Sequence, residues 1–152
     1  MNTEGIMLIV EIMNRVTRRV ISKKEKKDAN EAREKKWLLG DIEGYIDAME
    51  DCYLKDIDHS RQLVRATVSR MEDQTFGILR HASTARSSYY DDNDLIQILD
   101  ALSDVTTRVN IMYNAIISNY YLSDYAFKIL VKSNKDDIIK HIDILRDMLY
   151  SY

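Results

Sequence analysis

Proline is absent from this chain of 152 residues, and glycine occurs only four times. The residues that most often mark turns and sheet edges are therefore nearly missing, which favours long helices. A chain of this length fits one domain of ordinary size and can bury roughly two-thirds of the surface that it exposes when unfolded. We predict an all-α protein, a four- to five-helix bundle, whose core forms without a metal or disulfide.

Cysteine and long apolar runs are also scarce. Cys52 is the only cysteine, so neither an intramolecular disulfide nor a cysteine-based zinc site can form, and a reducing, cytoplasmic location is expected. No apolar stretch approaches the roughly 20 residues that cross a bilayer, so we expect no membrane span. The apolar run at residues 6–10 is followed by arginines, whereas the basic residues of a signal peptide come before its apolar core. Export is therefore not expected.

The charges are unevenly distributed along the chain. Residues 1–40 hold ten Lys and Arg against six Asp and Glu, a net charge of +4. Residues 41–152 hold twelve against nineteen, a net charge of −7. We therefore predict two parts: an N-terminal helix and charged arm over residues 1–40, and an acidic helical body over residues 41–152.

Apolar spacing predicts where the helices lie. A first helix begins near Thr3 and carries apolar residues at helical spacing up to Val20. Residues 22–36 contain no large apolar side chain and are expected to form an exposed helix or a loose arm. Gly40 and Asp41 together resemble a helix end followed by a new N-cap.

One very long central helix is predicted over residues 41–86, and two collinear helices broken near His59 and Ser60 are the alternative. Residues 87–93 have no helical apolar stripe and are expected to be a loop. A further helix follows from Leu95 to Ile116. Ser123 can cap a short helix, and residues 133–136 resemble a capping box that opens a last one.

Histidine is the natural place to look for acid–base or metal chemistry, and the chain has three: His59, His81 and His141. Asp56 and His59 have the spacing of half a di-iron site, but the second half and its additional glutamates are missing. No phosphate-binding glycine loop, nucleophile elbow or zinc-protease motif is present. We therefore expect no enzyme activity, no catalytic residue, no cofactor and no metal.

Two acidic pairs suggest another class of protein. Glu43 and Asp47, and likewise Asp100 and Asp104, stand one helical turn apart. The stretch 94–105 resembles a helix of the phosphate-uptake regulator family, the PhoU-like bundles. In that family such pairs ligate iron or zinc, so the resemblance implies a metal-binding regulatory bundle. The competing interpretation is that these carboxylates are solvated.

Basic residues suggest a nucleic-acid-binding bundle, such as a coat protein or accessory subunit, as an alternative. The candidate phosphate-binding residues are Arg15, Arg18, Arg19, Lys23, Lys24, Lys26 and Lys27. Arg61, Arg65 and Arg70 could extend a second patch. Four acids within residues 22–36 dilute the arm, so we expect weak binding at most.

The leading hypothesis is a non-enzymatic structural or adaptor protein that self-associates or binds a protein partner. An apolar stripe on a helix needs a partner, and tyrosine is enriched at interfaces. The candidate interface residues are Ile9, Met13, Val16, Trp37, Tyr89, Tyr90, Tyr120 and Tyr121. We expect a homo-oligomer or a protein complex, and the composition suits a protein of viral or mobile-element origin.

Overall fold

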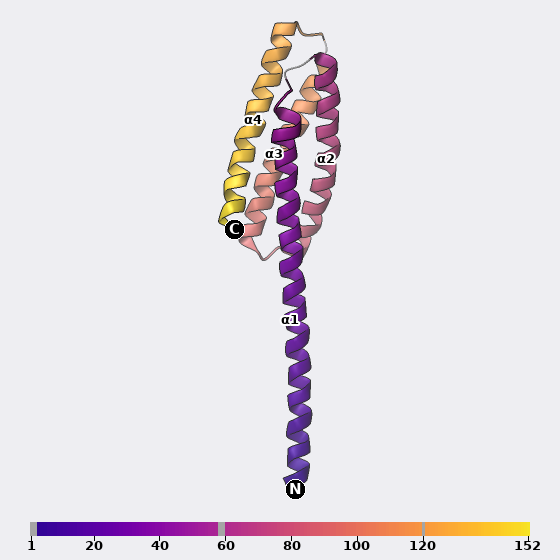
Figure 1. Ribbon diagram of the computed structural model, residues 1–152, viewed down its shortest axis with the longest axis vertical. Helices are drawn as coiled ribbons and strands as arrows, with labels where there is room; N and C mark the ends of the chain where they lie inside the picture. The colour runs from indigo at the N-terminus through magenta and orange to yellow at the C-terminus, as the bar shows by residue number, and fades with distance from the viewer. Residues whose placement is uncertain (1–2, 58–59, 120) are drawn as a thin grey trace. The chain divides into compact units, whose positions relative to one another are not determined.

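The computed structural model describes residues 3–57, 60–119 and 121–152, and this part of the chain holds helices and no strand. Figure 1 shows the helices in chain order. They are α1 (Thr3–Asp47), the π-helical segment η1 (Ala48–Leu54), α2 (Arg61–Ser88), α3 (Asn93–Ser118) and α4 (Asp124–Ser151). The prediction of an all-α bundle is confirmed. No helix within the described ranges combines the length and apolar character that crossing a membrane requires.

The chain divides into two compact units, Met1–Trp37 and Leu38–Tyr152. Of the first unit, the structure describes one stretch of α1 from residue 3 to residue 37. The second unit contains the end of α1 and all the later helices.

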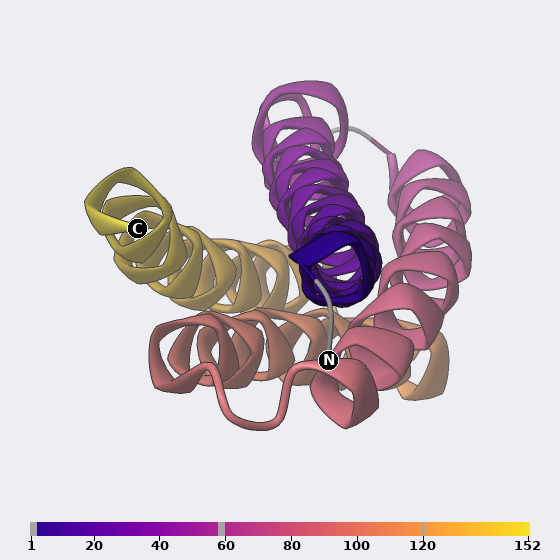
Figure 2. The ribbon, with the colours of Figure 1, turned by 90° about the horizontal axis from the view of Figure 1, so that it is seen from below.

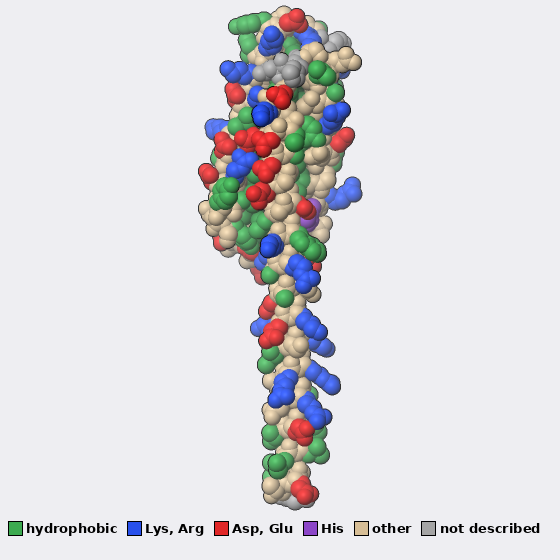
Figure 3. All heavy atoms as spheres, in the orientation of Figure 1, with side chains coloured by type: hydrophobic (Ala, Val, Ile, Leu, Met, Phe, Trp, Pro, Cys, Tyr) green, Lys and Arg blue, Asp and Glu red, His purple; other side chains and the backbone are tan. Residues whose placement is uncertain are grey.

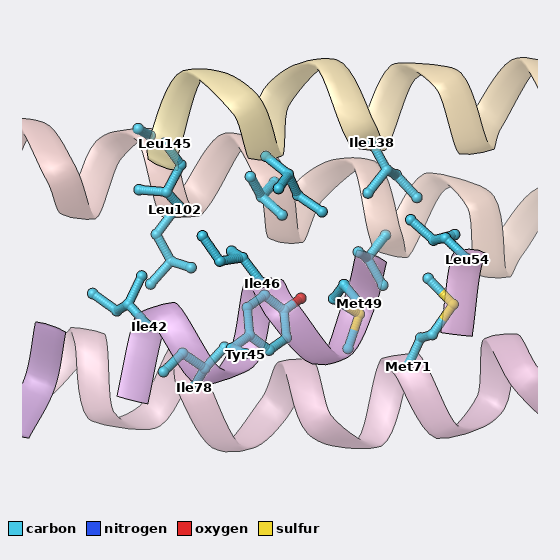
Figure 4. Packing of buried hydrophobic residues seen from close by; sticks show 14 of the residues in the cluster. Ile42, Tyr45, Ile46, Met49, Leu54, Met71, Ile78, Leu102, Ile138 and Leu145 are labelled. Atoms are coloured by element: carbon cyan, nitrogen blue, oxygen red, sulfur yellow. The ribbon is translucent and has the colours of Figure 1, made fainter. Parts of the chain in front are cut away.

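The second unit is a four-helix bundle (Figure 2). Its buried apolar side chains form one core cluster. The end of α1 and η1 contribute side chains that point between the other helices, as Figure 4 shows for Ile42, Ile46 and Met49. Its largest fully buried side chains are Leu38, Ile42, Ile46, Met49, Leu54, Met71, Leu95, Ile98, Leu99, Leu102, Met112 and Ile116. None of them comes from residues 3–37, so this core is complete without the first unit.

Three side chains fix where the later helices begin. The oxygens of Ser60, Asp92 and Ser123 accept hydrogen bonds from backbone N–H groups three residues on, at 3.4, 3.1 and 3.2 Å. Each satisfies a donor that the first turn of a helix leaves without an intrahelical partner. The predicted cap at Ser123 agrees with the start of α4. The loop predicted at residues 87–93 is shorter in the structure, because α2 ends at Ser88 and α3 begins at Asn93.

The predicted break at Gly40 and Asp41 is wrong, because α1 passes through both residues. Leu38 and Ile42 are buried on either side of Gly40, which is itself exposed. Burial of this face outweighs the intrinsic cost of a glycine in a helix, which is about 1 kcal/mol. The very long helix of the chain is therefore the first one, 52 residues with η1 included.

The single helix predicted over residues 41–86 is also wrong. The alternative of two helices broken near Ser60 is right about the break, but the two are not collinear, because α2 runs back alongside the end of α1, where the Tyr45 and Thr75 hydroxyls lie 2.6 Å apart. The first helix ends at Leu54 and α2 begins at Arg61, with Ser60 as its N-cap. His59 lies outside the described residues.

The predicted start of a separate last helix at residues 133–136 is a third error. α4 runs without interruption from Asp124 to Ser151. Val131 and Ile138 lie on its one buried stripe, which continues across this segment. Asn134 uses its side-chain amide to donate to the Leu130 carbonyl oxygen, at 2.8 Å, inside the helix.

Candidate interaction surface on the first helix

Residues 6–21 of α1 carry ten large apolar side chains, and all ten are between 47% and 67% exposed. We call residues 6–21 the association segment. Its apolar members are Ile6, Met7, Leu8, Ile9, Val10, Ile12, Met13, Val16, Val20 and Ile21. Three of them, Ile9, Met13 and Val16, were predicted interface residues, and the structure exposes all three.

Five of these side chains follow one line along the helix, which we call the seam. They are Ile6, Ile9, Met13, Val16 and Val20. Their spacing alternates between three and four residues, which is the repeat that lets one helix pack lengthwise on another. The apolar residues outside the seam, such as Met7 and Leu8, make the first two turns apolar around most of the helix.

Basic residues surround and follow the seam. The seven predicted phosphate-binding residues are all exposed. Lys23 and Lys27 continue the seam's own spacing, so they do not share the face of Arg15 and Arg18. Arg15 pairs with Glu11, with 2.6 Å between Nη2 and Oε1. Figure 3 shows this mixture of blue, red and green atoms along α1.

The predicted tyrosine interface is not brought together. Tyr90 and Tyr121 are both exposed, with relative exposures of 78% and 72%. They lie beyond opposite ends of α3, which has 26 residues and is therefore about 39 Å long, so they do not share one surface. Tyr89 is buried in the core, so it is not on the surface where a partner could reach it. Trp37 is exposed, and Tyr120 lies outside the described residues.

The predicted second basic patch is divided as well. Arg61 binds Asp124, 3.2 Å away, donates to the Leu122 carbonyl oxygen and stacks over the Phe127 ring at 4.8 Å. It therefore ties the start of α2 to the start of α4. Arg65 and Arg70 are exposed on α2.

Two of the four paired carboxylates considered for metal binding have arginine partners. Asp100 accepts from Arg86 at 2.7 Å, and Asp47 accepts from Arg146 at 2.9 Å. Among the described residues, no group of three or more His, Cys, Asp or Glu side chains is placed to hold a metal ion. Asp56 is exposed, and its predicted companion His59 is not described.

Arg146 links α4 to the end of the first helix. Its guanidinium donates to Glu50 at 2.7 Å and to Asp47 at 2.9 Å. The hydrogen bond with Glu50 is the main cause that raises the pKa of Arg146, and burial opposes it. The two acids come from α1 and η1, so this arginine fixes their junction against the bundle.

Two polar features of the bundle escape detection in the sequence. Between α2 and α3, Glu72 is buried beside a hollow of about 300 Å³. Its Oε1 accepts from Asn110 at 2.8 Å, whereas Oε2 has no hydrogen-bond partner. Glu72 follows Met71 and lies four residues after Val68, so helical spacing alone would have placed it at the edge of the buried face.

The second feature is a histidine–aspartate pair beside a hollow of about 340 Å³ between α1 and α2. His81 Nδ1 lies 2.9 Å from an Asp41 oxygen. A nucleophilic serine or cysteine is missing from the residues that line this hollow. The pair can therefore orient an imidazole, but this hollow does not supply the third member of a hydrolytic triad.

Tyr45 is a strongly perturbed titrating group in the core. Its hydroxyl lies 2.6 Å from the Thr75 hydroxyl, which in turn donates to the Met71 carbonyl oxygen. Burial raises the pKa of Tyr45 well above its usual value, with a smaller contribution from the charge of Glu72. Tyr45 is thus a neutral, structural hydrogen-bond donor.

Comparison of the chain with protein-family models, curated proteins and solved structures gives no match in any of the three.

Proposed function

We propose that the protein is a non-enzymatic structural or adaptor protein that self-associates through the association segment. The observation that carries the proposal is the contrast between ten exposed apolar side chains in residues 6–21 and a bundle core that contains none of them. Contiguous exposed apolar surface of this kind marks interaction sites.

The size of the seam indicates how tight such an association would be. A pair of seams contributes ten side chains, each already about half covered by its own helix. Burying the rest would supply on the order of 10 kcal/mol, since full burial of one such side chain is worth about 1.5–3 kcal/mol. The cost of association is of similar size, roughly 4–15 kcal/mol. At the low end of that cost about 6 kcal/mol remains, so we expect an oligomer that dissociates with a Kd of roughly tens of micromolar.

Light scattering over about 1–500 μM protein, a range that brackets a Kd of roughly tens of micromolar, tests the proposal on the full chain. We expect the mass to rise with concentration, and the triple variant Ile9→Asp, Met13→Asp, Val16→Asp to stay monomeric. The matched control, Leu8→Asp, Asn14→Asp, Ile21→Asp, introduces three carboxylates outside the seam and should still associate. A wild-type chain that is monomeric throughout would refute the proposal.

Nucleic-acid binding is the second candidate, because the seven predicted basic residues are all exposed. Phosphate contacts release counterions, so such binding would weaken steeply with salt. We expect only weak binding, since the acids within the arm and the net −7 of residues 41–152 oppose it. Sub-micromolar binding at physiological salt, lost when the seven residues become Gln, would reverse the order of the two candidates.

A further inference from the structure

The charges that follow the seam restrict how two copies can pair. After Val20, the positions that continue the seam are Lys23, Lys27, Asn30 and Glu34. α1 is helical through all four of them, and their side chains are exposed. The apolar line therefore becomes a charged line on the same side of the same helix.

In a parallel pair, each of these residues would meet its own copy. Lys23 would face Lys23, Lys27 would face Lys27 and Glu34 would face Glu34 at the centre of the contact. Arg19 and Lys24 would also be neighbours across the pair, because residues at these two positions flank a parallel seam. Like charges held together in this way oppose pairing.

In an antiparallel pair, four of the five seam residues can lie opposite an apolar residue without those contacts, and Ile6 lies opposite Lys23. When Met13 lies opposite Val16 of the second copy, Ile9 lies opposite Val20. In this register, the lysine run that begins at Lys23 starts opposite Ile6 of the other copy. The rest of the run lies nearer the N-terminus of that copy, close to Glu4. The basic runs are separated by the length of the seam.

We infer that the partner of the association segment is the same segment of a second copy, running antiparallel. The inference rests on the proposed function, because it specifies the partner and its direction for the same surface. Two properties of the described residues carry it: the five exposed seam residues and the exposed lysines that continue their line.

Disulfide trapping in the full chain distinguishes the two directions. The background variant is Cys52→Ser, because Cys52 is exposed and would form disulfides of its own. Ile9→Cys and Val20→Cys are then introduced in separate chains that carry tags of different mass. A disulfide requires Cα atoms within roughly 7 Å, and only an antiparallel pair brings residue 9 of one chain that close to residue 20 of the other. We therefore expect the mixture of the two chains to form at least about tenfold more mixed disulfide dimer than the homodimer that either chain forms alone.

Leu8→Cys in the same background is the matched control, because residue 8 lies outside the seam and reports chance encounters. Homodimers from Ile9→Cys alone and from Val20→Cys alone, with no excess of the mixed dimer, would show a parallel pair and overturn the inference while self-association stands. Light scattering that finds the Cys52→Ser background and the wild-type chain monomeric would instead remove the proposed function itself.

Discussion

The two halves of α1 have opposite environments within one continuous helix. From residue 6 to residue 21 every large apolar side chain is exposed, whereas Leu38, Ile42, Tyr45 and Ile46 are almost completely buried. Both halves have apolar residues at helical spacing. The difference is the surface that covers them, because three other helices cover the second half.

This contrast shows that an amphipathic stripe predicts that a helix packs against another surface. The stripe does not predict whether that surface belongs to the same chain or to another one. A helix of several turns is marginal in water and gains most of its stability from packing of its apolar face. The second half obtains that packing within the chain. For the first half, the proposed second copy would provide it.

The largest expected difference between the halves concerns stability. Ile46→Ala should lower the free energy of unfolding of the bundle by about 2–5 kcal/mol, because it leaves a cavity at a fully buried position. Met13→Ala, on the exposed half, should change it by less than about 0.5 kcal/mol in dilute solution. Urea denaturation followed by circular dichroism measures both. A large loss for Met13→Ala would mean that the first half is part of the folded core.

The sequence predicts the helical class well and the helix ends unevenly. The N-caps at Ser123 and just before Leu95 are predicted correctly, because capping depends on local side chains. Gly40 and residues 133–136 carry equally good local signals that the structure does not use, since buried stripes on both sides of each keep the helix intact. Local propensity is a weak prior where tertiary packing decides.

The candidate interface shows the same limit. Ile9, Met13 and Val16 share one helical line, so spacing alone groups them correctly. Tyr90 and Tyr121 are separated by the length of α3, which the predicted helix from Leu95 to Ile116 already implies. Tyr89 and Tyr90 are adjacent, and only one of them is exposed. Sequence proximity could not separate them, because burial at a helix end depends on the neighbouring helices.

The second half should also make stability sensitive to alkaline pH. An unfolded tyrosine loses its proton above pH 10, whereas Tyr45 keeps its proton in the fold, where burial raises its pKa. The unfolded state then binds fewer protons, so stability falls by about 1.4 kcal/mol per pH unit above pH 10. Tyr45→Phe should remove this part of the decline. Urea titrations at pH 9 to 12 on both proteins give the comparison, and parallel declines would contradict it.

Arg146 should matter for the end of the first helix in particular. Arg146→Met retains most of the aliphatic stem but loses the charge-assisted hydrogen bonds to Glu50 and Asp47. We expect a loss of about 1–2 kcal/mol, because the guanidinium is only partly buried. Hydrogen exchange should quicken most in η1. Arg65→Met is the control, since Arg65 is exposed on α2, and an equal effect of the two substitutions would exclude a specific role for Arg146.

Gly40 lies near the point where the two halves meet, and it offers the smallest and most direct test of their continuity. A Cβ placed on Gly40 would meet no atom within 4 Å, so alanine fits without moving a neighbour. Alanine is preferred to glycine inside a helix by about 0.5–1 kcal/mol, because it loses less backbone entropy on folding. Gly40→Ala should therefore raise the unfolding free energy by about that amount in urea denaturation of the full chain. An unchanged or lower value would mean that residue 40 is not helical and that the halves are separate helices, as the glycine and the following aspartate predict.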